Sequence, residues 1–240
     1  MTMSDSENIT VVRGLRAKIE NFWYHYKWHS IVSVFVIIAV LVCSLQMCGK
    51  EKFDAYIMYA GGYAVSQTED GDVAEYVKFH SSFKRVVPDT DENGDINPSF
   101  LNLYTPSDEE LDNVGSGSHN LIREDFSRLE YELVSGSEYY ICLLSSANYD
   151  KYKVFGEVSL FTPLAGLVPD GCEVEYYDEG AVYLHSLPFS ELDGIRNLPK
   201  DTVIALRKLS AVASVFDKGS NTRNREYAEK ILINIFTYTK

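Results

Sequence analysis

An acidic loop has the clearest metal-ligand spacing in the chain. The segment DTDENGDIN matches the first nine positions of an EF-hand calcium loop, in which carboxylate and amide oxygens alternate before a sharp glycine turn at Gly94. The candidate ligands are Asp89, Asp91, Asn93 and Asp95. The twelfth position is Phe100 rather than a bidentate carboxylate, and Pro98 opposes an exiting helix. A calcium site here needs a carboxylate from elsewhere; the alternative is a solvated Asp/Asn/Gly turn that leads into a strand.

Small polar residues follow three apolar segments, each at the point where a strand is expected to end. Ligands of parallel sheets bind beyond the carboxyl ends of the strands, so these positions are the candidate ligand site. They are Gly61, Gly62, Tyr63, Ser107, Ser145, Ser146 and Asn148. The two glycines could present backbone N–H groups to a carboxylate or another anion, or simply form a tight turn. Neither the lysine of a phosphate loop nor the third glycine of a dinucleotide fingerprint is present.

The sequence contains few signs of a catalytic motif. His80, His119 and His185 are the histidines beyond the first apolar segment, and none belongs to a zinc-binding HExxH motif. No GxSxG nucleophile elbow occurs. The chain is therefore expected to be non-catalytic.

Strand-like and helix-like segments alternate in the part of the chain that carries these candidates. Capping boxes at Ser66–Glu69 and Ser107–Glu110 open helices, and Gly136 stops a helix with apolar spacing from Leu121 to Leu133. Strands are expected at 54–60, 99–104, 139–144, 172–177, 181–186 and 202–206, a helix from the first capping box to His80, and an amphipathic helix around 227–236. The alternation predicts an α/β fold with a mostly parallel or mixed sheet.

An uncharged apolar run precedes this domain. Ile31–Cys48 has eighteen residues, and a helix of that length spans roughly 27 Å, close to the hydrocarbon thickness of a bilayer. The aromatic stretch Phe22–His29 before it is typical of a membrane interface. No small-residue cleavage site follows the run, which favours an uncleaved signal-anchor over a cleaved signal peptide, a lipoprotein at Cys48 or a buried core helix.

Charge around this run predicts the orientation and excludes one class of partner. Four basic residues lie before it, against Lys50 and Lys52 just after it, which favours a cytoplasmic N-terminus. The expected organisation is a cytoplasmic segment 1–30, a transmembrane helix 31–48 and an extracytoplasmic domain 49–240. The domain carries 18 basic and 32 acidic residues, a net charge of −14. Such a surface repels phosphate backbones, so nucleic-acid binding is not expected.

The four cysteines fall into two pairs. Cys43 and Cys48 lie in the apolar run, whereas Cys142 lies within an expected strand and Cys172 in a Pro-Asp-Gly turn. A disulfide between Cys142 and Cys172 is one possibility outside the cell; a buried free Cys142 is the favoured one.

Several motifs together resemble a known group of proteins. FWYHYKWH, KFDAYIMYAGGY, the Asn-Gly-Asp turn and the segment Arg128–Tyr149 are similar to uncharacterised membrane-anchored proteins of clostridia-type Gram-positive bacteria, a resemblance that implies no activity. The helix that runs through Leu133–Glu138 into the strand Tyr139–Leu144 resembles type 2 solute-binding proteins, which implies a ligand-binding α/β domain.

The favoured function is a membrane-anchored, extracytoplasmic, non-catalytic domain that recognises a small ligand or a protein partner at the cell surface. A structural or assembly component of an envelope complex is the first alternative. A cell-surface hydrolase is the second. No cofactor is expected other than calcium.

Overall fold

A computed structural model describes residues 14–48, 53–63, 73–111, 118–210 and 218–239. The chain divides into two compact units, Met1–Glu51 and Lys52–Lys240. The predicted capping box at Ser66–Glu69 lies outside the described residues.

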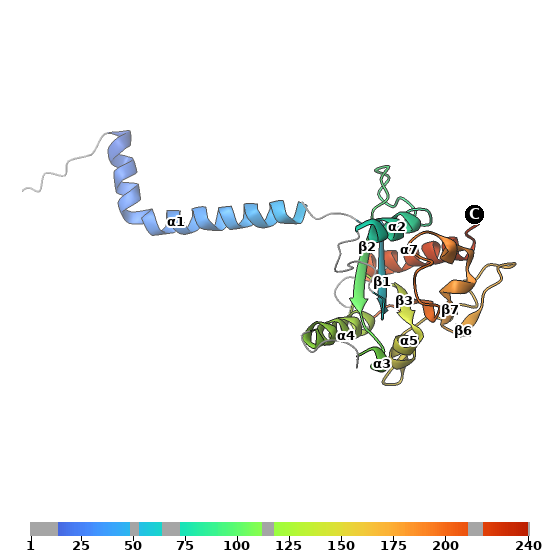
Figure 1. Ribbon diagram of the computed structural model, residues 1–240. Helices are drawn as coiled ribbons and strands as arrows, with labels where there is room; N and C mark the ends of the chain where they lie inside the picture. Colours follow the sequence, from blue (N-terminus) through green and yellow to red (C-terminus); the bar gives the residue numbers. More distant parts are fainter. Residues whose placement is uncertain (1–13, 49–52, 64–72, 112–117, 211–217, 240) are drawn as a thin grey trace, which may run out of the picture. The chain divides into compact units, whose positions relative to one another are not determined.

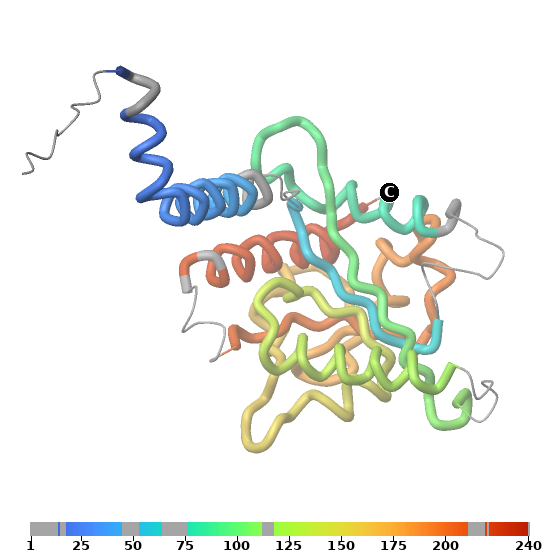
Figure 2. The backbone as a smooth tube through the Cα atoms, turned by 90° about the vertical axis from the view of Figure 1, so that its left-hand side faces the viewer, coloured from blue at the N-terminus to red at the C-terminus, as the bar shows by residue number. Residues whose placement is uncertain are grey.

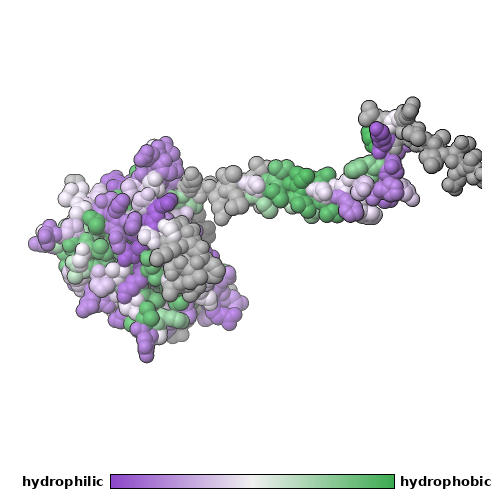
Figure 3. Space-filling model, turned by 180° about the vertical axis from the view of Figure 1, so that it is seen from behind, coloured by the Kyte–Doolittle hydropathy of each residue, from purple (hydrophilic) through white to green (hydrophobic). Residues whose placement is uncertain are grey.

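The first unit contains one long helix, α1 (Leu15–Cys48), which bends in its N-terminal half (Figure 1). Its apolar side chains from Ile31 to Val42 are exposed around the whole circumference and form a continuous apolar band (Figure 3). The stretch Lys18–Ser44 is long and apolar enough to cross a membrane, and a signal sequence near the N-terminus would meet the same criterion. The expected apolar helix is thus confirmed.

The second unit is built on a six-stranded mixed sheet, which confirms the predicted α/β class (Figure 1). Its strand order is β2 (Pro98–Tyr104), β1 (Ala55–Gly61), β3 (Ile141–Ser145), β8 (Thr202–Leu206), β7 (Ala181–Tyr183) and β6 (Tyr176–Asp178). β1 pairs in parallel with both β2 and β3, whereas the pairs β3–β8, β8–β7 and β7–β6 are antiparallel. Parallel pairing is therefore confined to the three strands that follow one another through helical crossovers.

Helices cover both faces of this sheet (Figure 2). The α-helices of the domain are α2 (Val73–Phe83), α3 (Asp108–Leu111), α4 (His119–Val134), α5 (Ser146–Tyr152) and α7 (Lys218–Phe236). The short elements are the strands β4 (Val154–Phe155) and β5 (Val158–Ser159) and the 3-10 helices η1 (Leu184–Ser186) and η2 (Pro188–Glu191). Residues of α2 and α7 pack on one face of the sheet, and those of α4 and α5 on the other.

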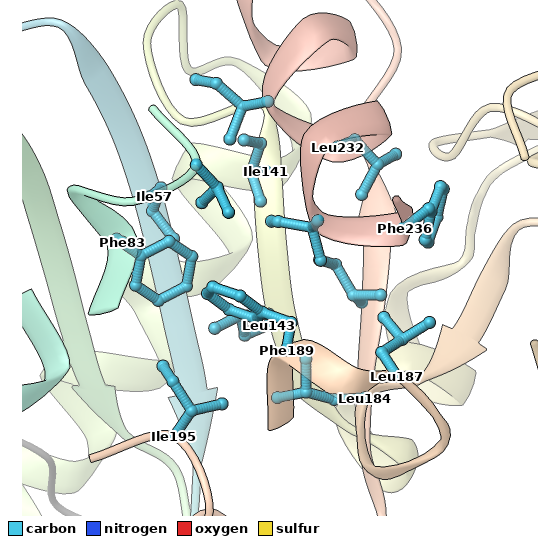
Figure 4. Packing of buried hydrophobic residues seen from close by; sticks show 14 of the residues in the cluster. Ile57, Phe83, Ile141, Leu143, Leu184, Leu187, Phe189, Ile195, Leu232 and Phe236 are labelled. Carbon is cyan, nitrogen blue, oxygen red and sulfur yellow. The ribbon is translucent and has the colours of Figure 1, made fainter. Parts of the chain in front are cut away.

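The two faces follow from the two-residue period of the strands. Ile57 of β1 faces α2 and α7, together with Leu143 of β3, and this larger cluster also takes in side chains of η1 and η2 (Figure 4). Met58 faces α4, together with Cys142. Central strands covered on both faces read as continuous apolar runs, which explains why 139–144 was recognisable from sequence.

The hairpin of β6 and β7 is shorter than expected. Strands were predicted at 172–177 and 181–186, but β6 and β7 contain only three residues each. The chain turns into η1 because Leu184 is buried, and Ser186 Oγ donates a hydrogen bond to the carbonyl of Tyr183. That hydroxyl also accepts from the backbone N–H of Glu175, so a side chain replaces the next pair of the strand ladder.

Gly194 provides a test of how tightly the loop after η2 packs on α2. Its φ is +83°, and a β-carbon there would lie 2.4 Å from the backbone nitrogen of Phe79. We expect Gly194→Ala to destabilise the protein by about 3 kcal/mol or more, because backbone strain and a steric clash with a helix backbone add. Urea unfolding is the measurement.

Gly171 is the matched control. Its φ is +89°, and nothing lies within 4 Å of a β-carbon at this position. Gly171→Ala should therefore lose only about 1 kcal/mol from the left-handed backbone. Equal losses for the two variants would contradict the packing of this loop against α2.

Candidate functional site

The three predicted polar clusters meet at one edge of the sheet. Gly61 pairs with Tyr104, and Ala60 pairs with Leu144, so β1, β2 and β3 end side by side. The crossover from β1 to β2 contains α2, and the crossover from β2 to β3 contains α4 on the opposite face. The carboxyl ends of β1 and β3 therefore form a topological switch point, the place where open α/β sheets bind ligands.

Asn148 ties the three strand ends together. It is buried, and its Nδ2 donates to the carbonyl of Ala60 at 3.3 Å and to Thr105 Oγ1 at 2.8 Å. Its backbone N–H donates to Ser145 Oγ at 3.3 Å, which caps α5. The predicted residues Asn148 and Ser145 thus hold the edge together, and Asn148 has little surface left for a ligand.

The two glycines make room for polar side chains that the sequence did not single out. A β-carbon at Gly61 would lie 2.6 Å from Tyr59 Oη, and one at Gly62 would lie 2.5 Å from Glu110 Oε2. Glu110 also accepts hydrogen bonds from the backbone N–H and the hydroxyl of Ser107, which confirms the predicted helix start. A carboxylate thus lies against Gly62, where an anionic ligand would experience repulsion.

The phenol of Tyr59 lies buried at this edge and has a raised pKa. Burial raises the pKa of Tyr59, and the negative charges of Asp201 and Glu110 raise it further, while a hydrogen bond from the backbone of Tyr63 opposes them. Asp201 also contacts Ser146, whose backbone N–H donates to the Asp201 carbonyl at 3.0 Å. The edge therefore presents hydroxyl groups and two carboxylates, which attract hydrogen-bond donors and cations.

The acidic loop places the four predicted calcium ligands in two different environments. Asn93 Oδ1 accepts from the N–H of Asp95, and the Asp95 carboxylate pairs with Lys84 at 3.2 Å. Asp89 and Asp91 instead have carboxylate oxygens within 4.8 Å of one another and of Asp54, the residue before β1. Calcium binding stays a prediction, and Asp54 is an additional candidate ligand.

Asp54 already has a structural role in this loop. Its carboxylate accepts from the N–H and the hydroxyl of Thr90 and from the N–H of Asn97, each at 2.8 Å. Burial raises the pKa of Asp54, but these hydrogen bonds outweigh burial, so the pKa lies below its ordinary value. By contrast, one buried oxygen of Asp89 has no hydrogen-bond partner in the described part of the chain, although its other oxygen accepts from the backbone N–H of Gly94 at 2.8 Å.

The remaining candidates take structural positions in the described part of the domain. His80 packs against the ring of Phe100, and burial together with Lys84 lowers its pKa. His185 Nδ1 lies 2.9 Å from the carbonyl of Lys200, beside a hollow of about 410 Å³. Cys142 and Cys172 are both free, and Cys142 is fully buried, as favoured from the sequence.

Comparisons with protein-family models, with curated proteins and with solved structures found no match.

The pH dependence of stability tests the role of Asp54. Its folded-state pKa lies below the unfolded value of 3.8, so its contribution is present above that value and is lost as pH falls through the folded pKa. We expect Asp54→Asn to cost about 3 kcal/mol near neutral pH, because hydrogen bonds to a charged acceptor disappear. The difference from wild type should shrink as the pH falls below 3.8, measured by urea unfolding from pH 7 down to about pH 2.

Asp95→Asn is the control, because the Asp95 side chain is 79% exposed. It should change stability by less than about 1 kcal/mol. A pH-independent loss in Asp54→Asn would contradict the assigned ionisation.

Proposed function

We propose that this protein is a membrane-anchored binding domain, with α1 as a single-span signal-anchor and the α/β domain outside the cell. The exposed apolar band of α1 supports the anchor, since a helix that is hydrophobic all round needs an apolar environment. The basic residues before the band support an N-terminus in the cytoplasm. The domain is non-catalytic in this proposal and recognises a ligand or a partner at the cell surface.

The edge where β1, β2 and β3 end is the observation that carries the proposal. It combines a switch point with polar groups from several separate segments: Tyr59, Gly61, Gly62, Ser107, Glu110, Ser145, Ser146 and Asp201. Groups that converge from distant parts of a chain at such an edge are typical of ligand sites. The resemblance to type 2 solute-binding proteins stays a prediction that agrees with this reading.

The chemistry of the edge favours a ligand with an amine or several hydroxyl groups. Glu110 lies against Gly62, and the negative charges of Glu110 and Asp201 both raise the pKa of Tyr59. An anionic ligand, which two glycines alone would suit, is disfavoured by these charges. A cationic or polyhydroxylated ligand gains charge-assisted hydrogen bonds instead.

Apolar exposure favours a second candidate, an assembly component of an envelope complex. The β4–β5 hairpin exposes Val154, Phe155 and Val158, each by about half or more of its surface. Clustered apolar side chains on a small hairpin are typical of a contact surface for another protein.

A thermal-shift experiment on the full-length protein in detergent tests the ligand class. Spermidine, glucosamine and ethanolamine are the cationic probes; acetate and phosphate are the anionic probes, and calcium chloride tests the acidic loop. We expect an amine to raise the melting temperature in a saturable manner. Glu110→Gln should weaken the apparent affinity about tenfold or more, because one charge-assisted hydrogen bond is lost.

Asp108→Asn is the matched control, because Asp108 lies on the same short helix and is exposed. It should leave the affinity unchanged. Stabilisation by the anions would refute the ligand class, and an amine effect that survives Glu110→Gln would place the ligand away from this edge. If no probe changes the melting temperature, the result would favour the second candidate, an assembly component of an envelope complex.

Membrane fractionation tests the anchor. Wild-type protein should stay in the membrane pellet after carbonate extraction, and protease added to intact cells should digest the domain. The double variant Val36→Lys and Ile38→Lys should not insert, because each charge costs about 3 kcal/mol at the centre of a span.

The double variant Val36→Leu and Ile38→Leu preserves apolarity and should fractionate like wild type. Release of a shortened, soluble wild-type chain would identify a cleaved signal sequence and refute the anchor.

A further inference from the structure

Arg207 is a fully buried cation next to the sheet. It follows β8, and its backbone N–H donates to the carbonyl of Tyr140 at 2.8 Å. Its Nε donates to the carbonyl of Tyr139 at 3.0 Å, and its guanidinium lies 4.7 Å from the centre of the Tyr140 ring. The side chain is thus held in place by one hydrogen bond and one cation–π contact.

Three polar atoms at this place have no hydrogen-bond partner among the residues that the structure describes. They are Nη1 and Nη2 of Arg207 and the hydroxyl oxygen of Tyr140, and all three are buried. Buried polar groups are almost always hydrogen-bonded, and an unpaired charge is far more costly than an unpaired neutral group. Three such atoms from two adjacent side chains point to a missing common partner.

No described carboxylate forms an ion pair with Arg207, although the negative charge of the buried Glu132 acts on it from beyond ion-pair distance. Glu132 accepts a hydrogen bond from Arg128 Nε at 3.1 Å and forms no ion pair with Arg207. Burial raises the pKa of the Cys142 thiol to about 12, so Cys142 is neutral. Arg225, whose positive charge also acts on Tyr140, pairs with Glu229 and with Thr162.

We propose that Arg207 Nη1 and Nη2 and the Tyr140 hydroxyl bind a small inorganic anion of the size of chloride inside the domain. The three groups are all hydrogen-bond donors towards an anion, and the guanidinium supplies the compensating charge. A water molecule would accept hydrogen bonds from these donors but would bring no negative charge to the guanidinium. Because the three donor atoms are buried, a small monovalent ion is expected to reach them more readily than a larger organic anion.

Two measurements on the full-length protein in detergent test this site. The first is the melting temperature in sodium chloride, bromide or gluconate at constant ionic strength, where gluconate is too large to enter. We expect saturable stabilisation by chloride and bromide relative to gluconate. The second is the line width of the chloride-35 NMR signal, which should broaden with protein and narrow again when bromide is added.

Variants assign the effect to the site. Arg207→Met removes the charge while keeping an apolar side chain, and it should abolish both halide effects. Tyr140→Phe keeps the charge and should weaken halide affinity about tenfold, so it decides the matter if Arg207→Met does not fold. Arg196→Met is the control, because Arg196 is exposed and pairs with Asp193 at the surface; it should respond to halide like wild type.

Equal melting temperatures in chloride and gluconate, without excess line broadening, would refute the site and indicate buried water instead. Halide effects that persist unchanged in Tyr140→Phe and Arg207→Met would place the anion elsewhere and would also overturn the proposal.

Discussion

The parallel pairing of β1 with β2 on one side and β3 on the other is the interaction on which the rest of the domain depends. Parallel neighbours require crossovers, and these crossovers place α2 and α4 on opposite faces of the sheet. Both faces of β1 are then buried, which accounts for its apolar sequence. The same pairing brings the three carboxyl ends to one edge and so creates the candidate site.

The edge shows how a packing requirement and a binding preference arise from the same residues. The Asn148 amide donates to the Ala60 carbonyl and to Thr105 Oγ1, which satisfies its own buried donor. Gly61 and Gly62 leave space for Tyr59 and Glu110. Because the space is filled by acceptors and negative charge, the proposed ligand is an amine or a polyol rather than an anion.

Two buried charged side chains of the domain, Asp54 and Arg207, differ in their hydrogen bonding. Asp54 has hydrogen bonds from Thr90 and Asn97, so the fold stabilises its ionised form. The Arg207 side chain has one hydrogen bond and one aromatic contact, while two of its nitrogens have no hydrogen-bond partner among the described residues. An arginine cannot lose its charge in the way a buried carboxyl group can, and in the proposed site a bound anion would balance that charge.

The sequence by itself determined the apolar helix α1, the α/β class and the convergence of the strand ends. These features depend on local periodicity, capping residues and the rule that parallel strands end at one edge. The predicted end of the strand at 181–186 was wrong. β7 ends at Tyr183 because Leu184 is buried in a 3-10 helix and Ser186 donates a side-chain hydrogen bond to Tyr183. Neither contact is signalled by a pattern in the neighbouring sequence.

Only the tertiary structure decided which side chains share a site. Asp54 joins Asp89 and Asp91 from a position 35 residues earlier in the chain, and Glu110 and Asp201 act on Tyr59 from two separate segments. The orphaned donors of Arg207 and Tyr140 became visible in the same way. Such groupings depend on long-range packing, because charge and burial at a residue are set by neighbours in space and not by neighbours in the chain.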